Sequence, residues 1–440
     1  MECLIEIPQR PGQPRSTSLA LGSPPGCSSG SSLHHDPRCQ MSIDITSMRL
    51  KPISDLVEAA HEIGIDNAAN LSKQELIFEI VRHHGASIRS AAGQGVLEIL
   101  PDGFGFLRSQ ECNYAPGPDD IYVSPSQIRR FNLRTGDLVA GQIRAPKEGE
   151  RYFALIKIEK INDGEPEGTR VKPIFDALTP IRPENRIQFT NGVDNVTARL
   201  MDNYLPMGFG QRVAVLAPPR AERIRLFKDL IHGIRSNHPD AEVLVLLLDE
   251  RPEEVTELQR NVEAEVLFST FDEPSSRHVQ VTDMAIERAK RMAEQGSDVV
   301  LFVDSLSRLA RAAHAASPAG GKMMNSLVDI AALQCVRRVF GAARCLEEGG
   351  SLTLFATLLS GSTFDDVVAE DLLGAANGVL RLDVDLADRE HHPALDLWGS
   401  RTGARENFLS DPELDAVKAR RRDLQGDAPQ DLAAAIEATN

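Results

Sequence analysis

The spacing of hydrophobic and polar residues predicts helices at the start of the patterned part of the chain. Between residues 41 and 90 apolar residues recur at intervals of three and four, which puts them on one face of a helix. Ser54 and Ser72 stand where helix N-caps are expected, and Glu75 follows Ser72 at the spacing of a capping box. We therefore predict a small helical domain at residues 41–90.

The next part of the chain alternates apolar and polar residues in short runs that are separated by turns. Such alternation is typical of strands with one buried face. The expected strands are residues 96–100, 104–107, 120–123, 138–143 and 152–156. Short strands at this spacing predict a small β-barrel of the OB-fold, cold-shock-like type at residues 91–161. Residues 162–181 are predicted to be a linker.

From about residue 182 onward, near-continuous apolar runs alternate with helical stretches. The apolar runs are residues 212–217, 243–248, 299–303 and 352–356. Strands that are buried on both faces of a parallel sheet have this pattern. Residues 182–440 are therefore predicted to form a doubly wound α/β domain, with ligands at the carboxyl ends of its strands. The predicted fold class is multidomain α/β.

Composition constrains compartment and partners only loosely. The net charge of −16 argues by itself against a nucleic-acid partner, but phosphate contacts depend on local clusters of Lys and Arg. The six cysteines show no paired CxxC spacing, which excludes a zinc ribbon and indicates reduced thiols in the cytoplasm. No apolar run is long enough for a membrane span. Residues 1–40 are rich in Ser, Gly and Pro, so we expect a disordered tail without a signal peptide, with Met41 as an alternative start.

The barrel region carries aromatic residues in a pattern that fits a nucleic acid. Residues 102–108, AspGlyPheGlyPheLeuArg, put Phe104 and Phe106 on one face of a strand, between glycines that leave room for bases. Further rings and cations come from the same region: Tyr114, Tyr122, Tyr152, Phe153, Arg108, Arg129, Arg130, Arg134, Lys147 and Arg151. Bases stack on such rings at roughly 1–3 kcal/mol each. The alternative is that both phenylalanines belong to the barrel core, and the neighbouring glycines, rings and cations favour RNA contact.

Three segments of this region, residues 102–108, 117–137 and 146–155, closely resemble the primary RNA-binding domain of the Rho family of bacterial transcription termination factors. The resemblance extends from about residue 52 to about residue 405. It implies contacts with single-stranded RNA at Gly103, Phe104, Gly105, Phe106, Leu107, Arg108, Asp120, Ile121, Tyr122, Glu150, Arg151 and Tyr152. It also implies a RecA-like, P-loop-type ATPase domain, ATP and Mg²⁺ as cofactors, and a hexameric ring. Pyrimidine-rich RNA and the RNA polymerase elongation complex are the implied partners.

The phosphate-binding loop departs from the family pattern. The family sequence AlaProProLysAlaGlyLysThr is replaced by AlaProProArgAlaGluArgIle at residues 217–224. A P-loop needs a glycine-rich backbone to cradle phosphate, a lysine for the β/γ-phosphates and a hydroxyl for Mg²⁺. Glu222 replaces the glycine, Arg223 the lysine and Ile224 the threonine. We therefore expect normal ATP binding to be lost.

Other positions of the motor domain keep the family pattern. By resemblance Glu250 is the water-activating carboxylate, Asp304 the magnesium-binding residue and Arg405 the arginine finger, although two residues are inserted before Arg405. Without the resemblance, Glu250 and Asp304 fit solvated strand ends equally well. His392 stands at the position of the aromatic that stacks on adenine. The implied nucleotide contacts are Gly208, Gly210, Gln211, Arg212, Arg220, Ala221, Arg223, Arg251 and His392.

The loops that grip RNA in the central channel of the family ring also differ. Ser326 and Leu327 replace paired glycines, and residues 360–366 lack the translocating lysine and carry Asp365 and Asp366, which we expect to repel RNA. Three functions therefore remain open. The chain is a termination factor that binds nascent RNA with impaired ATP turnover, a non-enzymatic pseudo-ATPase regulator that binds RNA or joins rings of an intact Rho, or a decaying duplicate.

Overall fold

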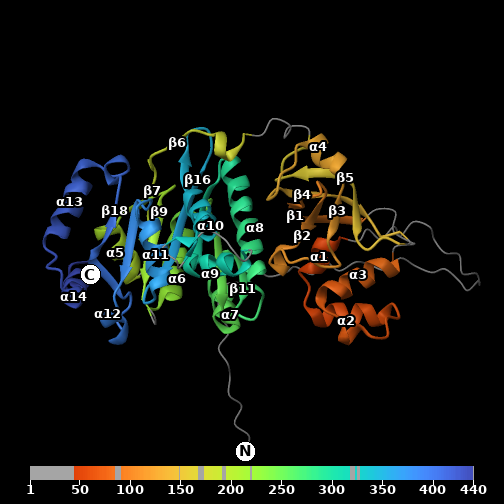
Figure 1. Ribbon diagram of the computed structural model, residues 1–440, viewed down its shortest axis with the longest axis horizontal. Helices are drawn as coiled ribbons and strands as arrows, with labels where there is room; N and C mark the ends of the chain where they lie inside the picture. The colour runs from red at the N-terminus through yellow and green to blue at the C-terminus, as the bar shows by residue number, and fades with distance from the viewer. Residues whose placement is uncertain are drawn as a thin grey trace, which may run out of the picture. The chain divides into compact units, whose positions relative to one another are not determined.

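The computed structural model describes most of the chain. The described residues are 44–84, 91–147, 149–166, 173–190, 195–218, 221–317, 323–324 and 328–439. The predicted tail at residues 1–40 lies outside them, as do Arg220, Ser326 and Leu327. A helical unit, a β-barrel and a sheet covered by helices follow one another along the chain (Figure 1). No helix within the described ranges is long and apolar enough to cross a membrane.

The helical unit packs on the barrel. Its elements are α1 (Ile45–Arg49), α2 (Ile53–Glu62), the 3₁₀ turn η1 (Ala68–Asn70) and α3 (Lys73–His84). Leu56 and Leu76 are fully buried in the same apolar cluster as Leu107 and Ile121 of the barrel. The helices therefore share a core with the barrel.

One of the two predicted helix caps is present. Ser72 donates its backbone N–H to Glu75 Oε2 at 2.8 Å, and its hydroxyl accepts the backbone N–H of Glu75 at 3.3 Å, which confirms the capping box. The prediction for Ser54 is wrong, because α2 begins at Ile53 and Pro52 is its N-cap. Proline is suited to a helix entry because its ring fixes φ near the helical value.

The barrel closes from the predicted strands in the order β1-β2-β3-β5-β4. Its elements are β1 (Ala91–Ile99), β2 (Gly105–Arg108), η2 (Gln110–Cys112), β3 (Ile121–Val123), α4 (Pro125–Phe131), β4 (Leu138–Arg144) and β5 (Phe153–Ile161). In β4 every second residue is buried, among them Val139 and Ile143. This period of two is the one that predicts the barrel from the sequence.

The remaining strands belong to the α/β domain. They are β6 (Pro180–Ile181), β7 (Arg186–Ile187), β8 (Met207–Gly208), β9 (Arg212–Ala217), β10 (Glu242–Glu250), β11 (Glu265–Thr270), β12 (Asp298–Asp304), β13 (Met323–Met324), β14 (Val328–Asp329), β15 (Arg344–Leu346), β16 (Ser351–Leu359), β17 (Gly378–Leu382) and β18 (Leu395–Thr402). The main sheet has the order β11-β10-β12-β16-β9-β17-β18. All neighbours along this order are parallel except β17 and β18.

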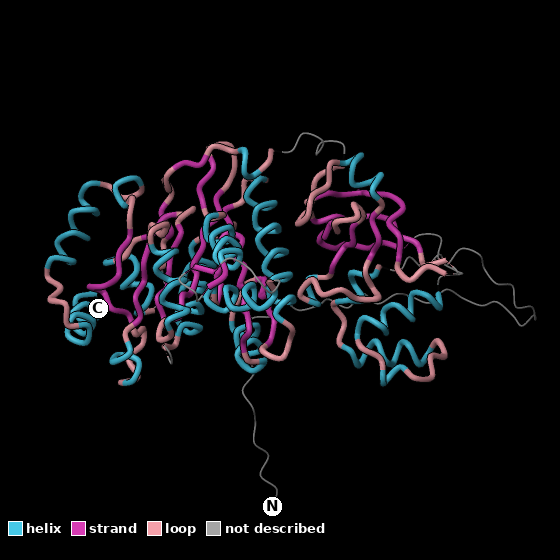
Figure 2. Tube along the Cα trace, in the orientation of Figure 1, coloured by secondary structure: helices cyan, strands magenta, loops and turns pink. Residues whose placement is uncertain are grey.

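Helices cover both faces of this sheet (Figure 2). They are η4 (Phe175–Ala177), α5 (Val196–Tyr204), α6 (Arg223–Asn237), α7 (Pro252–Asn261), α8 (Ser275–Glu294), α9 (Leu306–Ala316), α10 (Ile330–Gly341), α11 (Thr363–Leu373), α12 (Val384–Asp388), η5 (Arg405–Asn407), α13 (Asp411–Arg422) and α14 (Ala428–Thr439). Alternate residues of β10 enter two different cores, as Leu246 packs with α8 and Leu247 with α6. The predicted doubly wound sheet with strands buried on both faces is thereby confirmed.

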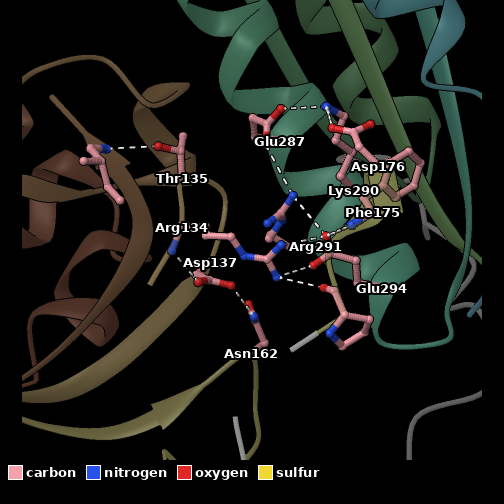
Figure 3. Close-up of polar contacts among 12 residues, drawn as sticks. Arg134, Thr135, Asp137, Asn162, Phe175, Asp176, Glu287, Lys290, Arg291 and Glu294 are labelled. Carbon is pink, nitrogen blue, oxygen red and sulfur yellow. Dashed lines mark hydrogen bonds and ion pairs between the residues drawn. The ribbon is translucent and has the colours of Figure 1, made fainter. Parts of the chain in front are cut away.

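Charged contacts join the barrel to the α/β domain. Arg134 of the barrel donates from Nη2 to Glu294 Oε2 of α8 at 2.7 Å, next to Arg291 and Glu287 (Figure 3). The described end of the predicted linker also reaches α8, because Phe175 is fully buried and donates its backbone N–H to Glu294 Oε1 at 2.7 Å. Glu294 thus accepts hydrogen bonds from the barrel and from the linker.

Candidate functional site

Four aromatic rings gather on one side of the barrel. Phe104 and Phe106 lie 5.8 Å apart between centroids, Phe104 and Tyr122 are also 5.8 Å apart, and Phe106 and Tyr152 are 4.8 Å apart. The antiparallel register of β2 and β3 pairs Phe106 directly with Tyr122. We call Phe104, Phe106, Tyr122 and Tyr152 the ring cluster.

The rings of this cluster differ in exposure. Tyr152 is 38% exposed and Phe104 and Tyr122 are half-buried, whereas Phe106 is 7% exposed. Phe106 therefore supports the other rings from beneath, and those three present the surface on which a base can stack. Tyr114, which the sequence grouped with these rings, is fully buried and donates its hydroxyl to Glu265 of β11 at 2.6 Å.

Two hollows flank the exposed ring of Tyr152. The larger has a volume of about 630 Å³ and is lined by Tyr122, Gln127, Arg144 and Glu150 among others. The smaller measures about 330 Å³ and lies against residues 116–118. Hollows of this size accommodate small organic groups such as a nucleobase.

Arg108 is not a free cation. Its side chain is buried, donates from Nε to Glu98 Oε2 at 2.7 Å and from Nη1 to Asp120, and lies over the ring of Phe106 at 5.0 Å. Burial raises the pKa of Asp120 to about 6, against the opposing effect of Arg108. Arg108 therefore fixes Phe106, and the predicted phosphate contact falls to the exposed Arg129, Arg130, Lys147 and Arg151.

Glu150 is held by a bidentate ion pair. Arg144 donates from Nη1 and Nη2 to its two carboxylate oxygens at 2.5 and 2.9 Å. These hydrogen bonds, together with the backbone N–H of Lys147, lower the pKa of Glu150 to about 2. The carboxylate is thus an ionised acceptor next to the larger hollow, which suits the amino group of a base.

Four of the predicted RNA contacts have structural tasks. The side chains of Leu107 and Ile121 are fully buried in the barrel core and offer only their backbone. A Cβ on Gly105 would lie 2.8 Å from the Glu98 carbonyl oxygen, so this glycine allows strand pairing and does not open a path for bases. Gly103 has a φ of +85° and open space around it, so its glycine shapes the turn before β2.

At the carboxyl edge of the sheet the phosphate loop leads into α6. Arg223 is the first residue of this helix and Glu222 its N-cap, without a side-chain capping bond. The Glu222 carboxylate is exposed and accepts a hydrogen bond from Arg225 at 3.0 Å. Ile224 is buried in the core between α6 and the sheet, as is Ala221. Thus the side chain at position 224 packs in the core and offers no hydroxyl to a metal ion.

Arg223 reaches into the acidic edge of the sheet. Its Nε donates to Asp304 Oδ2 at 2.5 Å and its Nη2 to Glu250 Oε2 at 2.9 Å. Arg308 of α9 also donates to Glu250 Oε2, at 2.6 Å. Arg223, Glu250, Asp304 and Arg308 form a closed group that we call the Arg223 cluster.

The protonation preferences in this cluster follow burial and charge. Burial disfavours the charged form of Arg223, but the two carboxylates outweigh it and raise its pKa above the ordinary value. Complete burial raises the pKa of Asp304 despite both guanidinium groups. For Glu250 burial is outweighed by Arg308 and Arg223, so its pKa is lowered.

These residues do not fit a magnesium nucleotide bound in the manner of a P-loop. The guanidinium of Arg223 occupies the place next to Asp304 where such loops hold the metal, and no threonine hydroxyl stands at position 224. Over the described ranges no group of three or more His, Cys, Asp or Glu side chains is arranged to hold a metal ion. Arg251 and Arg223 line a hollow of about 510 Å³ at this edge together with Lys228.

His392 lies beside α6 and is held there. Its Nε2 is 2.7 Å from Asp229 Oδ2, an oxygen that also accepts the Thr197 hydroxyl at 2.5 Å. Its Nδ1 is 3.7 Å from Glu222. Burial opposes ionisation of Asp229, but the hydrogen bonds from His392 and Thr197 lower its pKa overall. The imidazole is therefore engaged with acids of the phosphate-loop helix.

Four of the predicted nucleotide contacts and the predicted arginine finger lie at the opposite edge of the sheet. Gly208, Gly210, Gln211 and Arg212 precede or begin β9, whereas the phosphate loop follows its last residue; six strand residues span about 17 Å. Their contacts are structural: Gln211 Nε2 donates to the Gly403 carbonyl at 2.9 Å and Arg212 Nη1 to the Ala343 carbonyl at 2.9 Å. Arg405 follows Gly403 in η5 at the same edge. These residues therefore lie a strand's length from the chain's own phosphate loop.

The described channel loop differs from its predicted chemistry. Asp365 is buried in the first turn of α11, where it accepts the Ser362 hydroxyl at 2.6 Å and pairs with Arg311. Its carboxylate is therefore paired within the chain, while Asp366 is exposed. The contacts of Ser326 and Leu327 fall outside the described residues.

Arg308 and Arg144 are the residues that sequence reasoning missed. Arg308 follows Asp304 by four residues and enters the helix after the strand, and this spacing was available as a signal. Arg144 meets Glu150 across the turn between β4 and β5, a contact without a simple sequence signature.

Comparisons with known proteins agree with this architecture. Residues 48–86 match the family model of the Rho termination factor N-terminal domain, and residues 93–167 that of the Rho termination factor RNA-binding domain. Residues 197–402 match the nucleotide-binding domain of the ATP synthase alpha/beta family.

Full-length relatives are close in sequence. Transcription termination factor Rho of Haemophilus influenzae is 48% identical over 399 residues, 89% of this chain and 94% of the relative. That of Pseudomonas fluorescens is 48% identical over 400 residues, 90% of this chain and 95% of the relative. A solved ATPase of the type III secretion system of pathogenic bacteria shares the fold alone, at 22% identity and a TM-score of 0.50 over 56% of this chain and 70% of that one. The chain therefore belongs to the Rho family of transcription termination factors.

Proposed function

We propose that this protein captures single-stranded, pyrimidine-rich RNA on the barrel and acts on nascent transcripts at the RNA polymerase elongation complex in the cytoplasm. The ring cluster is the observation that carries this proposal. Phe104, Tyr122 and Tyr152 present ring surface, and Tyr152 lines two hollows. Glu150 offers an ionised acceptor in the larger of them. A small base fits beside a tyrosine and donates its amino group to that carboxylate.

The motor domain is proposed to bind and hydrolyse ATP poorly or not at all. The guanidinium of Arg223 fills the place that Mg²⁺ needs, and the loop lacks the glycine and threonine of a working P-loop. Where a nucleotide did bind, Arg251 and Lys228 are placed to contact it at the carboxyl edge.

A second candidate function is a regulator that enters rings of an intact Rho. The observation that favours it is the separation between the altered phosphate loop and Arg405, which lies at the other edge of the sheet. Such a chain can contribute Arg405 to the nucleotide site of a neighbouring subunit while its own phosphate loop binds no nucleotide. A homo-hexamer without turnover is the alternative assembly.

Two measurements on the full-length protein test these proposals. Fluorescence anisotropy with oligo(C) and oligo(A) is expected to show tighter binding of oligo(C), and equal or absent binding would overturn the RNA proposal. Phosphate release with poly(C) is expected to stay at background, and turnover of about 1 per second or faster would overturn the proposed loss of ATPase activity. Native mass spectrometry, alone and after mixing with a relative that keeps Lys and Thr in the loop, separates homo-hexamers from mixed rings.

A further inference from the structure

The Arg223 cluster joins four separate elements of the motor domain. Arg223 is the first residue of α6, Glu250 ends β10, Asp304 ends β12 and Arg308 belongs to the first turns of α9. Its ion pairs cross large sequence separations, 27 residues to Glu250 and 81 residues to Asp304. The side chain of Arg223 is 16% exposed and those of Glu250 and Asp304 are 5% and 0% exposed. These contacts are therefore shielded from water and from salt.

The charges of this cluster balance only because Arg223 is present. Two carboxylates face two guanidinium groups, and Arg308 contacts Glu250 while Arg223 contacts both acids. Asp304 is fully buried, and its Oδ1 accepts no hydrogen bond from any described residue. Without Arg223 a fully buried carboxylate loses its ion-pair partner, and such a group is costly to keep ionised in a protein interior.

In a P-loop ATPase the corresponding elements are bridged by a bound metal ion and nucleotide. There a metal ion held by the phosphate-loop hydroxyl and the acidic strand end bridges to the nucleotide phosphates. In this protein the side chain of a phosphate-loop residue itself reaches the acidic strand ends. A guanidinium at 2.5 Å from Asp304 and a metal ion on the same oxygen exclude each other.

We propose that Arg223 is a built-in cation that holds the carboxyl edge of the motor sheet together without nucleotide or metal, and that its removal turns the Glu250–Asp304 pair into a divalent-cation site. This inference rests on the proposed loss of ATP-driven function, because a motor that cycles has to open and close this edge. The fold of the motor domain is then independent of Mg²⁺ and ATP.

The test uses three variants of the full-length protein. Arg223→Ala removes the built-in cation, and Arg223→Ala combined with Asp304→Asn also removes the buried charge that it neutralises. Arg225→Ala is the matched control, because Arg225 lies on the same helix, is 56% exposed and pairs only with the exposed Glu222 among the described residues. Thermal unfolding is followed in EDTA and in millimolar Mg²⁺ or Mn²⁺.

We expect the wild type and Arg225→Ala to unfold at the same temperature with EDTA and with metal. Arg223→Ala is expected to melt roughly 10 °C lower in EDTA and to regain part of this loss with metal. The double variant is expected to recover stability in EDTA and to lose the response to metal. Isothermal titration with Mn²⁺ should give binding to Arg223→Ala alone.

Several results would overturn the inference. They are an unchanged melting temperature of Arg223→Ala in EDTA, a stabilisation of the wild type by metal as large as that of the variant, or failure of both Arg223 variants to fold. ATP hydrolysis by the wild type would instead refute the proposed loss of turnover. Absence of hydrolysis together with a metal-insensitive Arg223→Ala would refute this inference alone.

Discussion

In the barrel, the ring cluster is assembled from residues of or next to three strands, whereas in the phosphate loop three adjacent residues decide whether phosphate and metal can bind. The barrel has the four rings of this cluster, and the buried Arg108 lies over one of them, Phe106. The loop lies between β9 and α6, as in a P-loop. Its Arg223 side chain donates hydrogen bonds to Asp304 and Glu250 of the same chain.

The difference shows how the residues of a phosphate loop can change while the surrounding fold remains. Replacing the loop residues leaves Glu250 and Asp304 buried, and these acids need a cation whether or not ATP is present. Arg223 and Arg308 supply that charge from within the chain. The acids at the carboxyl edge of the motor sheet are thus balanced by cations of the same chain.

The largest effect is expected when the loop is rebuilt as Glu222→Gly, Arg223→Lys and Ile224→Thr. This change restores the backbone cradle, shortens the cation and supplies the hydroxyl that the metal needs. We expect nucleotide binding to appear, as seen with a fluorescent ATP analogue and Mg²⁺, from no detectable binding in the wild type. RNA-stimulated turnover and unwinding should stay absent, because residues 360–366 offer no lysine to grip phosphate.

The single change Glu222→Gly is the control for this experiment, since it leaves Arg223 in the cluster and should not bring nucleotide binding back. Unwinding of an RNA–DNA hybrid by the triple variant would show that the altered channel loop is neutral. No nucleotide binding at all would place part of the damage at His392, which is tied to Asp229. Ile224 is buried, so the triple variant should also lose about 1 kcal/mol of stability.

The second prediction concerns the rings. Phe104→Ala together with Phe106→Ala removes one stacking surface and the ring beneath it, and RNA binding should weaken by roughly tenfold to a hundredfold. Phe131→Ala is the matched control, because this ring lies on α4 outside the cluster. Anisotropy titrations with oligo(C) measure the effect. An affinity equal to that of the control, in a variant that circular dichroism shows to be folded, would return both rings to a purely structural role.

The sequence predicted the fold well where the pattern of burial is local. The alternation in β4 and the apolar runs of β10 and β12 each report which faces are covered, and the strands form where expected. The edge strand β18 is not predicted, because only four of its eight residues are buried and the apolar run is interrupted. The local spacing of apolar residues therefore predicts core strands better than edge strands.

The sequence predicts the phosphate-loop site only where the type of residue alone decides whether phosphate or metal can bind. Loss of the P-loop hydroxyl at Ile224 is visible in the sequence, but the direction of the Arg223 side chain depends on where α6 starts relative to β10 and β12. Likewise Gly208 and Arg212 precede the phosphate loop closely in sequence. Strand β9 nevertheless separates them from the loop, so they lie at the opposite edge of the sheet.

The third prediction tests how firmly the barrel is attached to the altered motor. Arg134→Ala removes the bidentate hydrogen bonds to Glu294 of α8, which then keeps Arg291 and the Phe175 backbone as partners. We expect a loss of about 1–3 kcal/mol in chemical unfolding. Arg129→Ala, an exposed change on α4, should stay within about 0.5 kcal/mol of the wild type. Equal stabilities for the two variants would mean that the Arg134 contact contributes nothing measurable.

The smallest expected effect is a pH dependence of RNA binding that belongs to the barrel alone. The pKa of Asp120 is raised by burial to about 6, so its carboxylate is mostly ionised at pH 7 and mostly protonated at pH 5. Protonation weakens one of the two carboxylate contacts of Arg108 and leaves the platform one charge more positive. RNA affinity should therefore rise about threefold from pH 7 to pH 5, the size expected of one partly shielded ion pair.

The same titration affects stability in a defined direction. Because the folded protein holds this proton more tightly than the unfolded chain, whose carboxyl has the ordinary value of 3.8, the contribution of Asp120 to stability rises as the pH falls through about 6. Asp120→Asn imitates the protonated form, so it should bind RNA at pH 7 as the wild type does at pH 5. Titrating both proteins with oligo(C) across this range isolates Asp120 from the histidines, which both proteins share. A pH dependence that persists unchanged in Asp120→Asn would assign the effect to another group.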